Sequence, residues 1–251
     1  MRGASAYDRI RELWDAHSRE ESEVAARQRF GIGRAAAGLV LALTITGAGV
    51  PGLVRAQGAG WQKEMAAFEA QDRAAPPASG GIVFVGSSSI RLWDLPKAFP
   101  GLPVVNRGFG GSQVADSVAH VDLLVVRHKP RSVVFYAGDN DIAAGKAPAV
   151  VAADFRAFVD KVHAALPRTR IAFIGIKPSL QRWALVGKVR EANSLVRVFC
   201  EGDDRLGFID VDGPMLGWDE KPRADLFVAD GLHMTPTGYE VWTALVRPFL
   251  E

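Results

Sequence analysis

The sequence predicts an α/β protein, a three-layer α/β/α sandwich around a parallel sheet of about five strands. Short apolar runs alternate along the chain with longer segments that have helical periodicity. The short runs are apolar at every position instead of at alternate positions, which is typical of parallel strands buried on both faces. Helices that connect such strands cover the two faces of the sheet.

This alternation begins near Gly81 and continues to the C-terminus. The expected strands are Ile82–Val85, Val104–Val105, Ser132–Tyr136, Ile171–Ile174 and Phe208–Val211. The expected helices are roughly Gln113–Arg127, Pro148–Ala165, Gln181–Cys200 and Pro236–Phe249. Upstream, Trp61, Met65 and Phe68 repeat at helical spacing and predict an amphipathic helix, which a linker over Ala74–Gly81 joins to the sheet.

The N-terminal part of the chain differs in composition from the rest. Residues 1–34 are charged and form an expected N-terminal extension, whereas Ala35–Val54 is uncharged and largely apolar. Val54-Arg55-Ala56 resembles a signal-peptidase site. We therefore expect residues 35–57 to be a signal peptide or a membrane anchor, and residues 58–251 to form the globular domain.

Two alternatives for this region remain open. The apolar stretch could be a buried helix of the domain, although its four glycines and one proline disfavour that structure. The long segment before it fits a cytoplasmic extension, a misplaced start codon or an uncleaved anchor. The expected location is the periplasm or the medium, with anchoring in the inner membrane through residues 35–54 as the alternative.

Composition and charge exclude several classes of protein. The chain has 30 basic and 28 acidic residues and a net charge of +2, which leaves no electrostatic footprint for nucleic acid. Its single cysteine, Cys200, excludes an intrachain disulfide and a cysteine-cluster metal site. The acidic residues show no metal-ligand spacing, so we expect no metal and no other cofactor.

Two segments at opposite ends of the domain contain the groups that serine chemistry requires. Gly86-Ser87-Ser88-Ser89 follows an apolar run, and Asp230-Gly231-Leu232-His233 lies near the C-terminus. A serine nucleophile needs a base within hydrogen-bond reach and an anion that orients the base. An aspartate and a histidine three residues apart can supply both from one turn.

Polar segments that follow three expected strands should meet at one edge of the sheet. Gly86–Ser89, Asn106–Gly111 and Gly138–Asp141 each follow such a strand, and ligand sites in open α/β sheets form at this edge. Each segment also has a simpler explanation. The serine cluster suits a helix N-cap, Gly138–Asp141 suits a turn, and the glycines of Asn106–Gly111 suit a phosphate loop, although no Lys-Ser/Thr follows them.

The remaining histidines lie in segments with helical patterns. We expect them to be solvated or packed: His17, His120, His128 and His163.

Four blocks in this order resemble those of the SGNH superfamily, also called GDSL lipases and esterases. Phe84–Ile90 looks like the block with the nucleophile, and Asn106–Ser112 looks like the glycine block. Tyr136–Asp141 is similar to the Gly-x-Asn-Asp block, and Asp230–Tyr239 to the Asp-x-x-His block and its helix. The resemblance covers about residues 60–251 and implies a flavodoxin-like sandwich.

The resemblance also implies roles for individual residues. Ser88 would be the nucleophile, His233 the general base and Asp230 the group that orients His233. The oxyanion hole would consist of the backbone N–H groups of Ser88 and Gly111 and the side-chain amide of Asn140. One position departs from the family, because Ser87 stands where an aspartate is usual. Ser87 and Ser89 are therefore rival hydroxyls.

The function that these residues predict is a serine esterase or acylhydrolase that cleaves short acyl esters, including acetyl esters, through an acyl-enzyme. The expected partner is an ester of a small molecule, carbohydrate or lipid. Two alternatives remain: acyl transfer to an exported polysaccharide by the same residues, and a non-catalytic binding module of the same fold.

Overall fold

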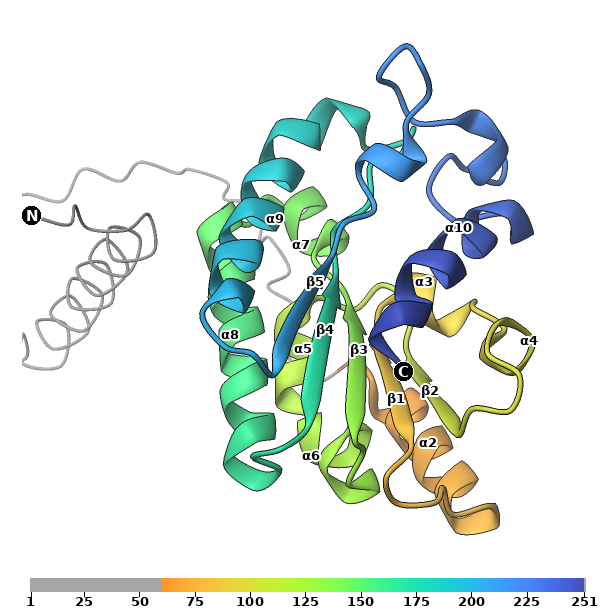
Figure 1. The fold of residues 1–251 in the computed structure, drawn as a ribbon, viewed down its shortest axis with the longest axis vertical. Coiled ribbons are helices and arrows are strands. Elements are labelled where there is room, and N and C mark those ends of the chain that lie inside the picture. The colour runs from red at the N-terminus through yellow and green to blue at the C-terminus, as the bar shows by residue number, and fades with distance from the viewer. Residues whose placement is uncertain (1–59, 251) are drawn as a thin grey trace, which may run out of the picture. The chain divides into compact units, whose positions relative to one another are not determined.

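The computed structural model describes residues 60–250, and these form a parallel sheet covered by helices on both faces (Figure 1). The five strands are ordered β2-β1-β3-β4-β5. They are β1 Ile82–Gly86, β2 Val104–Gly108, β3 Ser132–Tyr136, β4 Arg170–Ile174 and β5 Leu206–Ile209. Every neighbouring pair is parallel, which confirms the predicted fold class.

The strand order determines where a site can form. The chain moves from β1 outward to β2, and then returns to the other side of β1 to form β3. Ligands bind beyond the carboxyl ends of the strands at such a switch point. The carboxyl ends lie at the top of Figure 1, where the chain enters α3 (Ser88–Arg91) after β1 and α7 (Asp139–Ala143) after β3.

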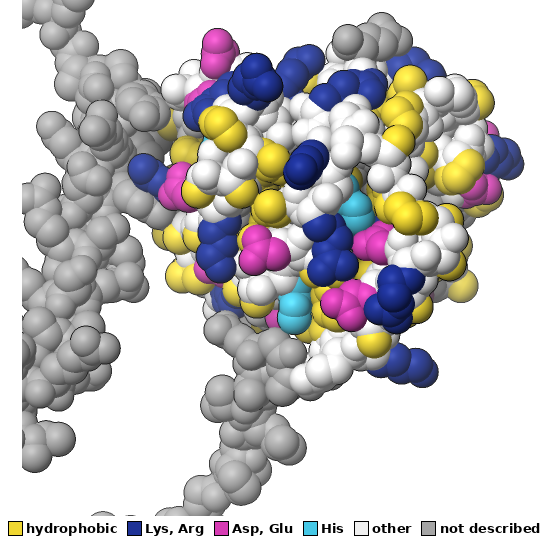
Figure 2. Space-filling model, turned by 90° about the horizontal axis from the view of Figure 1, so that it is seen from below, with side chains coloured by type: hydrophobic (Ala, Val, Ile, Leu, Met, Phe, Trp, Pro, Cys, Tyr) yellow, Lys and Arg dark blue, Asp and Glu magenta, His cyan; other side chains and the backbone are white. Residues whose placement is uncertain are grey.

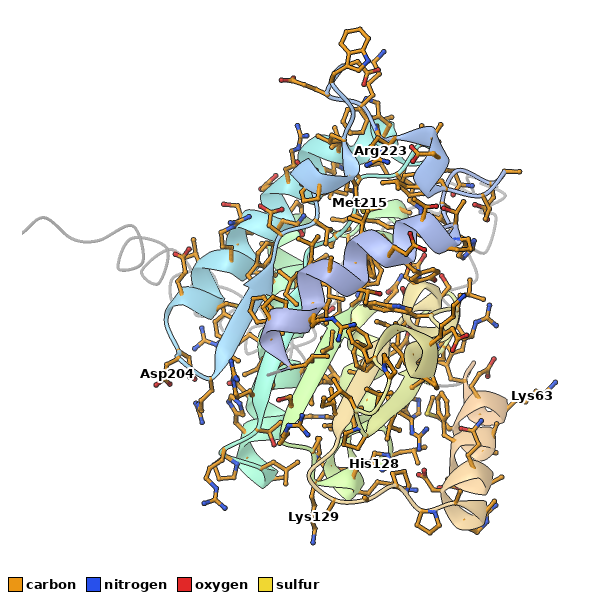
Figure 3. The ribbon with its side chains drawn as sticks, turned by 45° about the vertical axis from the view of Figure 1, so that its right-hand side comes forward. Lys63, His128, Lys129, Asp204, Met215 and Arg223 are labelled. Carbon is orange, nitrogen blue, oxygen red and sulfur yellow. The ribbon has the colours of Figure 1, made fainter. Side chains whose placement is uncertain are left out.

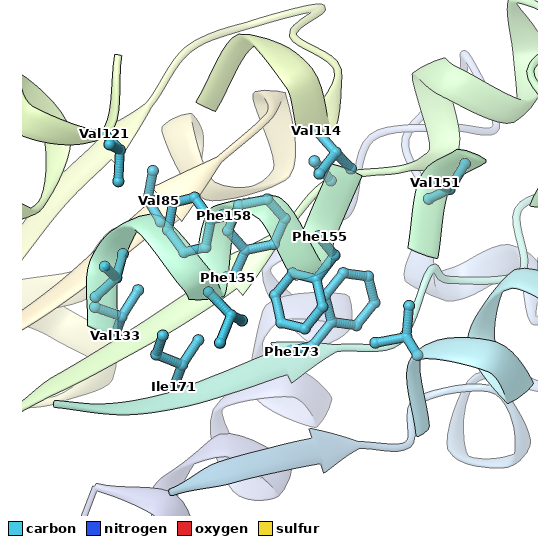
Figure 4. Packing of buried hydrophobic residues seen from close by; sticks show 14 of the residues in the cluster. Val85, Val114, Val121, Val133, Phe135, Val151, Phe155, Phe158, Ile171 and Phe173 are labelled. Atoms are coloured by element: carbon cyan, nitrogen blue, oxygen red, sulfur yellow. The ribbon is translucent and has the colours of Figure 1, made fainter. Parts of the chain in front are cut away.

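Two hydrophobic cores fill the layers on either side of the sheet. Alternate strand residues, including Val85 and Phe135, pack against α2, α5, α6, α8 and α9 in the larger core (Figure 4). The intervening residues, including Phe84 and Tyr136, pack with α3, α4 and α10 around Trp242. Both faces of the central strands β1 and β3 are thus buried, which explains why these strands are apolar along most of their length.

The helices have the following bounds. They are α2 Gln62–Ala74, α4 Leu95–Ala98, α5 Val114–Ala119, α6 Val121–Leu124, α8 Pro148–Ala165, α9 Val186–Glu201 and α10 Pro236–Val246, together with α3 and α7. Short 3₁₀ turns accompany them at Val126–His128, Trp183–Leu185, Gly213–Met215, Ala224–Leu226 and Arg247–Phe249. Helix α8 has the predicted bounds.

Three predicted elements differ from the structure. The single helix expected over Gln113–Arg127 is divided at His120, because α5 packs against α8 whereas α6 packs against α2. The last strand lies at Leu206–Ile209 instead of Phe208–Val211, because its pairing with β4 starts at Leu206 and ends where β4 ends. Helix α9 begins only after a 3₁₀ turn that follows the long loop from β4.

The opposite end of the molecule, at the amino ends of the strands, is seen from below in Figure 2. There, Lys and Arg side chains lie among Asp and Glu side chains, so that charges of both signs share this face. Within residues 60–250, no helix is long and apolar enough to cross a membrane. The expected extension at residues 1–34 and the whole signal or anchor segment at 35–57 lie outside the described residues, so these expectations stay predictions.

Candidate active site

The serine cluster occupies the turn between β1 and α3. Gly86 has a φ of +141°, and a Cβ at this position would lie only 1.8 Å from the carbonyl oxygen of Tyr136, so the turn requires glycine. Ser87 is the N-cap of α3, and its N–H donates to the Tyr136 carbonyl at 2.9 Å. The turn therefore places Ser88 at the first position of a helix, where the backbone N–H has no partner within the helix.

The three serines have different environments. Ser87 and Ser89 are buried, with 0% and 2% of their surface exposed, whereas Ser88 is half-buried. Ser89 Oγ accepts a hydrogen bond from Lys177 Nζ at 3.1 Å. Ser88 is thus the hydroxyl of the three that solvent and a substrate can reach.

His233 lies between Ser88 and Asp230. Its Nε2 atom is 3.0 Å from Ser88 Oγ, and its Nδ1 atom is 2.6 Å from Asp230 Oδ2. The other oxygen of Asp230 accepts from the backbone N–H groups of Leu232 and His233, at 2.8 and 2.9 Å. The loop before α10 therefore holds the carboxylate at both oxygens, which orients the imidazole toward Ser88.

These hydrogen bonds change the acidity of Asp230. The hydrogen bond from His233 and then those from the two backbone N–H groups lower the pKa of Asp230 to about 2. The carboxylate is consequently ionised throughout the neutral and mildly acidic range, and it can stabilise a proton on His233.

The candidate oxyanion donors lie on the loops that follow β1, β2 and β3. Gly111 has a φ of +80° in the turn before α5, and Asn140 lies in the first turn of α7. The side-chain Nδ2 of Asn140 donates to the carbonyl of Ser112 at 2.9 Å, so the amide is next to the glycine block. The structure thus places the glycine block and the Asn140 amide in direct contact.

The buried side chain of Asp141, on α7, connects this helix to the start of α5. Asp141 Oδ2 accepts from the backbone N–H of Val114, at the start of α5, at 3.1 Å, and Asp141 Oδ1 accepts from Lys146 Nζ at 2.9 Å. Burial raises the pKa of Asp141, although the hydrogen bond from Lys146 opposes this shift. Asp141 therefore links α7 to the start of α5, which follows the glycine block in the chain.

The sequence analysis missed a group of charged residues at this edge of the sheet. Lys177 and Arg182 lie on the loop after β4, and both approach Asp139 Oδ2, at 3.4 and 3.2 Å. Lys177 Nζ also donates to the hydroxyl of Tyr136 at 3.0 Å, and burial lowers the pKa of Lys177. Lys177 lies three residues after the end of β4, and this position was the available signal, since the same rule identified the other three loops.

The other histidines of the described domain lie away from this site. His128 is buried, and His120 and His163 are half-buried, with His163 Nε2 3.0 Å from the carbonyl oxygen of Thr169. Within residues 60–250, no group of three or more His, Cys, Asp or Glu side chains is arranged to hold a metal ion. Cys200 is buried, and burial raises its pKa to about 12.

Residues 86–241 match the model of the GDSL-like Lipase/Acylhydrolase family. The match includes Ser88, Asn140 and His233, and it spans more than half of the chain. The chain therefore belongs to the GDSL-like lipase/acylhydrolase family, and membership implies hydrolase activity on esters. Among curated proteins, none matches the chain significantly.

Solved structures share the fold at low sequence identity. A candidate platelet activating factor from Streptococcus pneumonia has a TM-score of 0.69 at 19% identity, over 75% of this chain and 92% of that chain. A GDSL-like lipase from Bacteroides thetaiotaomicron has a TM-score of 0.65 at 17% identity, over 74% and 96%. An acetyl-xylooligosaccharide esterase from Geobacillus Stearmophilus has a TM-score of 0.55 at 16% identity, over 68% and 94%.

Proposed function

We propose that the protein is a serine esterase that cleaves short-chain acyl esters through an acyl-enzyme. The observation that carries this proposal is the position of His233, whose two ring nitrogens lie 3.0 Å from Ser88 Oγ and 2.6 Å from Asp230 Oδ2. This geometry fits a nucleophile, a general base and a group that orients the base. The half-buried Ser88 is also accessible to a substrate.

In the first half of the reaction, Ser88 Oγ attacks the ester carbonyl carbon while its proton moves to His233 Nε2. The carbonyl oxygen becomes an oxyanion, which would accept hydrogen bonds from the backbone N–H groups of Ser88 and Gly111 and from Asn140 Nδ2. The tetrahedral intermediate then collapses and the bond to the alcohol oxygen breaks. His233 donates the proton to the departing alcohol.

In the second half, a water molecule attacks the acyl-Ser88 carbonyl and gives its proton to His233. Collapse of this intermediate releases the carboxylic acid and returns the proton to Ser88 Oγ. Asp230 stays ionised in both halves because its pKa is about 2, and it stabilises the imidazolium that forms twice in each turnover.

The proposed substrate is a short-chain acyl ester, acetyl esters included, of a small molecule, carbohydrate or lipid. One of the structural neighbours is an acetyl-xylooligosaccharide esterase, which supports an acetylated carbohydrate as one class to test. A hollow of about 680 Å³ between α4 and α10 offers room for the rest of a substrate. Its lining includes Met234, which follows His233 in the chain, and Leu92, whose N–H donates to the carbonyl of Ser88.

A fluorophosphonate probe and a series of p-nitrophenyl esters of increasing acyl length test this proposal. We expect the probe to label the wild-type protein at Ser88 and hydrolysis to be fastest with the short esters. The Ser88→Ala variant should show neither labelling nor hydrolysis. A wild-type protein that is not labelled would support the non-catalytic binding module instead, and labelling without hydrolysis unless an acceptor alcohol is added would support acyl transfer.

We also propose that the hydrolase domain acts outside the cytoplasm, because a basic segment, an apolar stretch and a signal-peptidase-like site precede it in the sequence. N-terminal sequencing of the protein from fractionated cells tests this proposal. A chain that begins near Gln57 in the periplasm or the medium would support export, and a full-length chain in the membrane fraction would support anchoring. Recovery of the full-length chain from the soluble cytoplasm would contradict both.

A further inference from the structure

The side-chain amide of Asn140 suits the proposed reaction in only one of its two orientations. An asparagine amide has two N–H donors on Nδ2 and an acceptor on Oδ1. With Nδ2 toward the ester, the amide donates to the developing oxyanion, but a rotation of 180° would present Oδ1 and repel the negative charge. The rate of the reaction therefore depends on which end of the amide faces the substrate.

Contacts at both ends distinguish the two orientations. Arg182 Nη2 donates to Asn140 Oδ1 at 3.0 Å, and Asn140 Nδ2 donates to the carbonyl of Ser112 at 2.9 Å. A guanidinium group has donors and no acceptor, so the rotated amide would place donor against donor at Arg182 and oxygen against oxygen at Ser112. In the observed orientation, one Nδ2 hydrogen is used by Ser112 and the second is left for an oxyanion.

Arg182 is itself held by the buried carboxylate of Asp139. Its Nη1 atom is 3.2 Å from Asp139 Oδ2, and the same oxygen is 3.4 Å from Lys177 Nζ. Lys177 is only 2% exposed and also contacts Tyr136 and Ser89. The Arg182 side chain is 19% exposed, so this carboxylate and the surrounding protein restrict its conformations.

We propose that Arg182 is a positioning residue that acts through Asn140: it holds the side-chain amide with Nδ2 toward the reacting carbonyl, and Asp139, itself paired with Lys177, holds Arg182. The inference rests on the proposed function, in which Asn140 is an oxyanion donor. A residue with this role affects the transition state, where the oxyanion exists, more than it affects substrate binding.

Steady-state kinetics of Arg182→Met on the best p-nitrophenyl ester test the proposal. We expect kcat to fall by roughly 10- to 100-fold, because the amide loses its fixed orientation, and KM to stay within about twofold. Arg182→Lys, which keeps the charge but reaches only one of the two partners, should give an intermediate kcat. The matched control is Arg190→Met on α9, which also removes an arginine paired with an aspartate, here Asp212 at 3.0 Å. It should leave kcat within about twofold.

A double-mutant cycle separates action through Asn140 from a general structural effect. Asn140→Ala alone should lower kcat by roughly 100- to 1000-fold. In the Asn140→Ala background, Arg182→Met should change kcat by less than about twofold, because no amide remains to be oriented. A further loss there as large as in the wild-type background would overturn the proposal. If Arg182→Met does not fold, as judged by its thermal unfolding, Arg182→Lys provides the same comparison.

The outcomes also separate this inference from the proposed function. A wild-type protein that hydrolyses none of the esters would overturn both. An active wild-type protein whose Arg182→Met variant has the same kcat as Arg190→Met would overturn only the positioning role of Arg182.

Discussion

Two histidines of the described domain are paired with a carboxylate, at 2.6 and 3.8 Å, and they lie at opposite ends of the sheet. His233 is at the carboxyl ends of the strands, on the loop that follows the segment labelled at Met215 and Arg223 in Figure 3. His128 is at the opposite end, just before β3 begins (Figure 3). Their environments differ in exposure, in the partner of Nε2 and in the distance along the chain to the carboxylate. These differences indicate why His233, and not His128, is the proposed base.

His233 is open to solvent, and its partner is Ser88, the proposed nucleophile. The side chains of His233 and Asp230 are 30% and 43% exposed, and the aspartate is only three residues away in sequence. Because Asp230 contacts Nδ1, Nε2 is directed at Ser88 Oγ. The ring can therefore take a proton from the hydroxyl and pass it to a group that enters from solvent.

His128 is enclosed by charged side chains. Its side chain is 4% exposed, its Nε2 atom accepts from Arg107 Nε at 3.4 Å, and Asp72 Oδ2 is 3.8 Å from the same nitrogen. Burial, followed by the charge of Arg107, lowers the pKa of His128. A carboxylate near a histidine is thus not sufficient for base catalysis, since the nitrogen that would take the proton must face a nucleophile instead of a guanidinium group.

The largest effect on kcat is expected from removal of the proposed base, His233, or of its partner, Ser88. His233→Ala and Ser88→Ala should each lower kcat by roughly 10⁶-fold on a p-nitrophenyl ester, because the two groups act as a unit. The double variant should be at most several-fold worse than either single variant. A loss in the double variant close to the product of the two single losses would argue against a shared mechanism.

The next effect concerns the carboxylate that orients His233. Asp230→Asn should lower kcat by about 10⁴-fold, because the amide favours the wrong tautomer of the ring. The lowered pKa of Asp230, about 2, keeps the wild-type carboxylate ionised in mild acid. The NMR signal of the Asp230 carboxyl carbon should therefore show no titration with a midpoint of about 4, the ordinary value for an aspartate. A midpoint of about 4 would contradict the lowered pKa.

A smaller effect is expected at the two serines that flank Ser88. Ser87→Ala and Ser89→Ala should each retain activity within about tenfold, because neither hydroxyl forms the covalent bond. Both are buried, and Ser89 Oγ is a partner of Lys177. If Ser87→Ala or Ser89→Ala abolished labelling by the fluorophosphonate probe, the assignment of the nucleophile would be wrong.

The smallest effect on activity is expected at the opposite end of the sheet. His128→Gln should leave kcat within about twofold but change how stability depends on pH. The folded pKa of His128 is below its ordinary value of 6.5, so the unfolded chain binds a proton that the folded protein does not. Wild-type stability should thus fall as the pH decreases below 6.5, by up to about 1.4 kcal/mol per pH unit until the folded pKa is reached.

Urea unfolding of wild type and His128→Gln at pH 7.5 and 5.5 measures this contribution. The variant should lose less stability between the two values than the wild type, because it lacks the titrating group. Equal losses in the two proteins would show that His128 is protonated in the folded state. If His128→Gln lowered kcat as much as His233→Ala does, the contrast between the two histidines would be wrong.

The sequence was most informative where the relevant contacts are local. Helix α8 begins at Pro148 and ends at Ala165 as predicted, because its apolar periodicity is unbroken over five turns. Asp230 and His233 were recognisable because they lie three positions apart within one turn. By contrast, the break at His120 was not visible, because it depends on which distant helices α5 and α6 pack against.

Contacts between distant parts of the chain explain what the sequence analysis missed. Asp72 lies 56 positions before His128, so no spacing rule relates the two residues. Lys177 and Arg182 meet Asp139 and Asn140 across about 40 residues of chain, because β3 and β4 are neighbours in the sheet. The sequence predicted only that His128 is solvated or packed, and it did not indicate that Asp72 and Arg107 would be its neighbours.

The sequence by itself determined the layered α/β architecture, the strand-end loops and the residues most suited to the chemistry, because burial and turn geometry depend on neighbours a few positions apart. Tertiary structure decided the rest. It brought Ser88 within 3.0 Å of His233, from 145 positions away, and it buried Ser87 and Ser89 while leaving Ser88 accessible. It also brought Arg182 within hydrogen-bond distance of Asn140. Strand order and the packing of loops produce these contacts, and no local pattern in the chain specifies them.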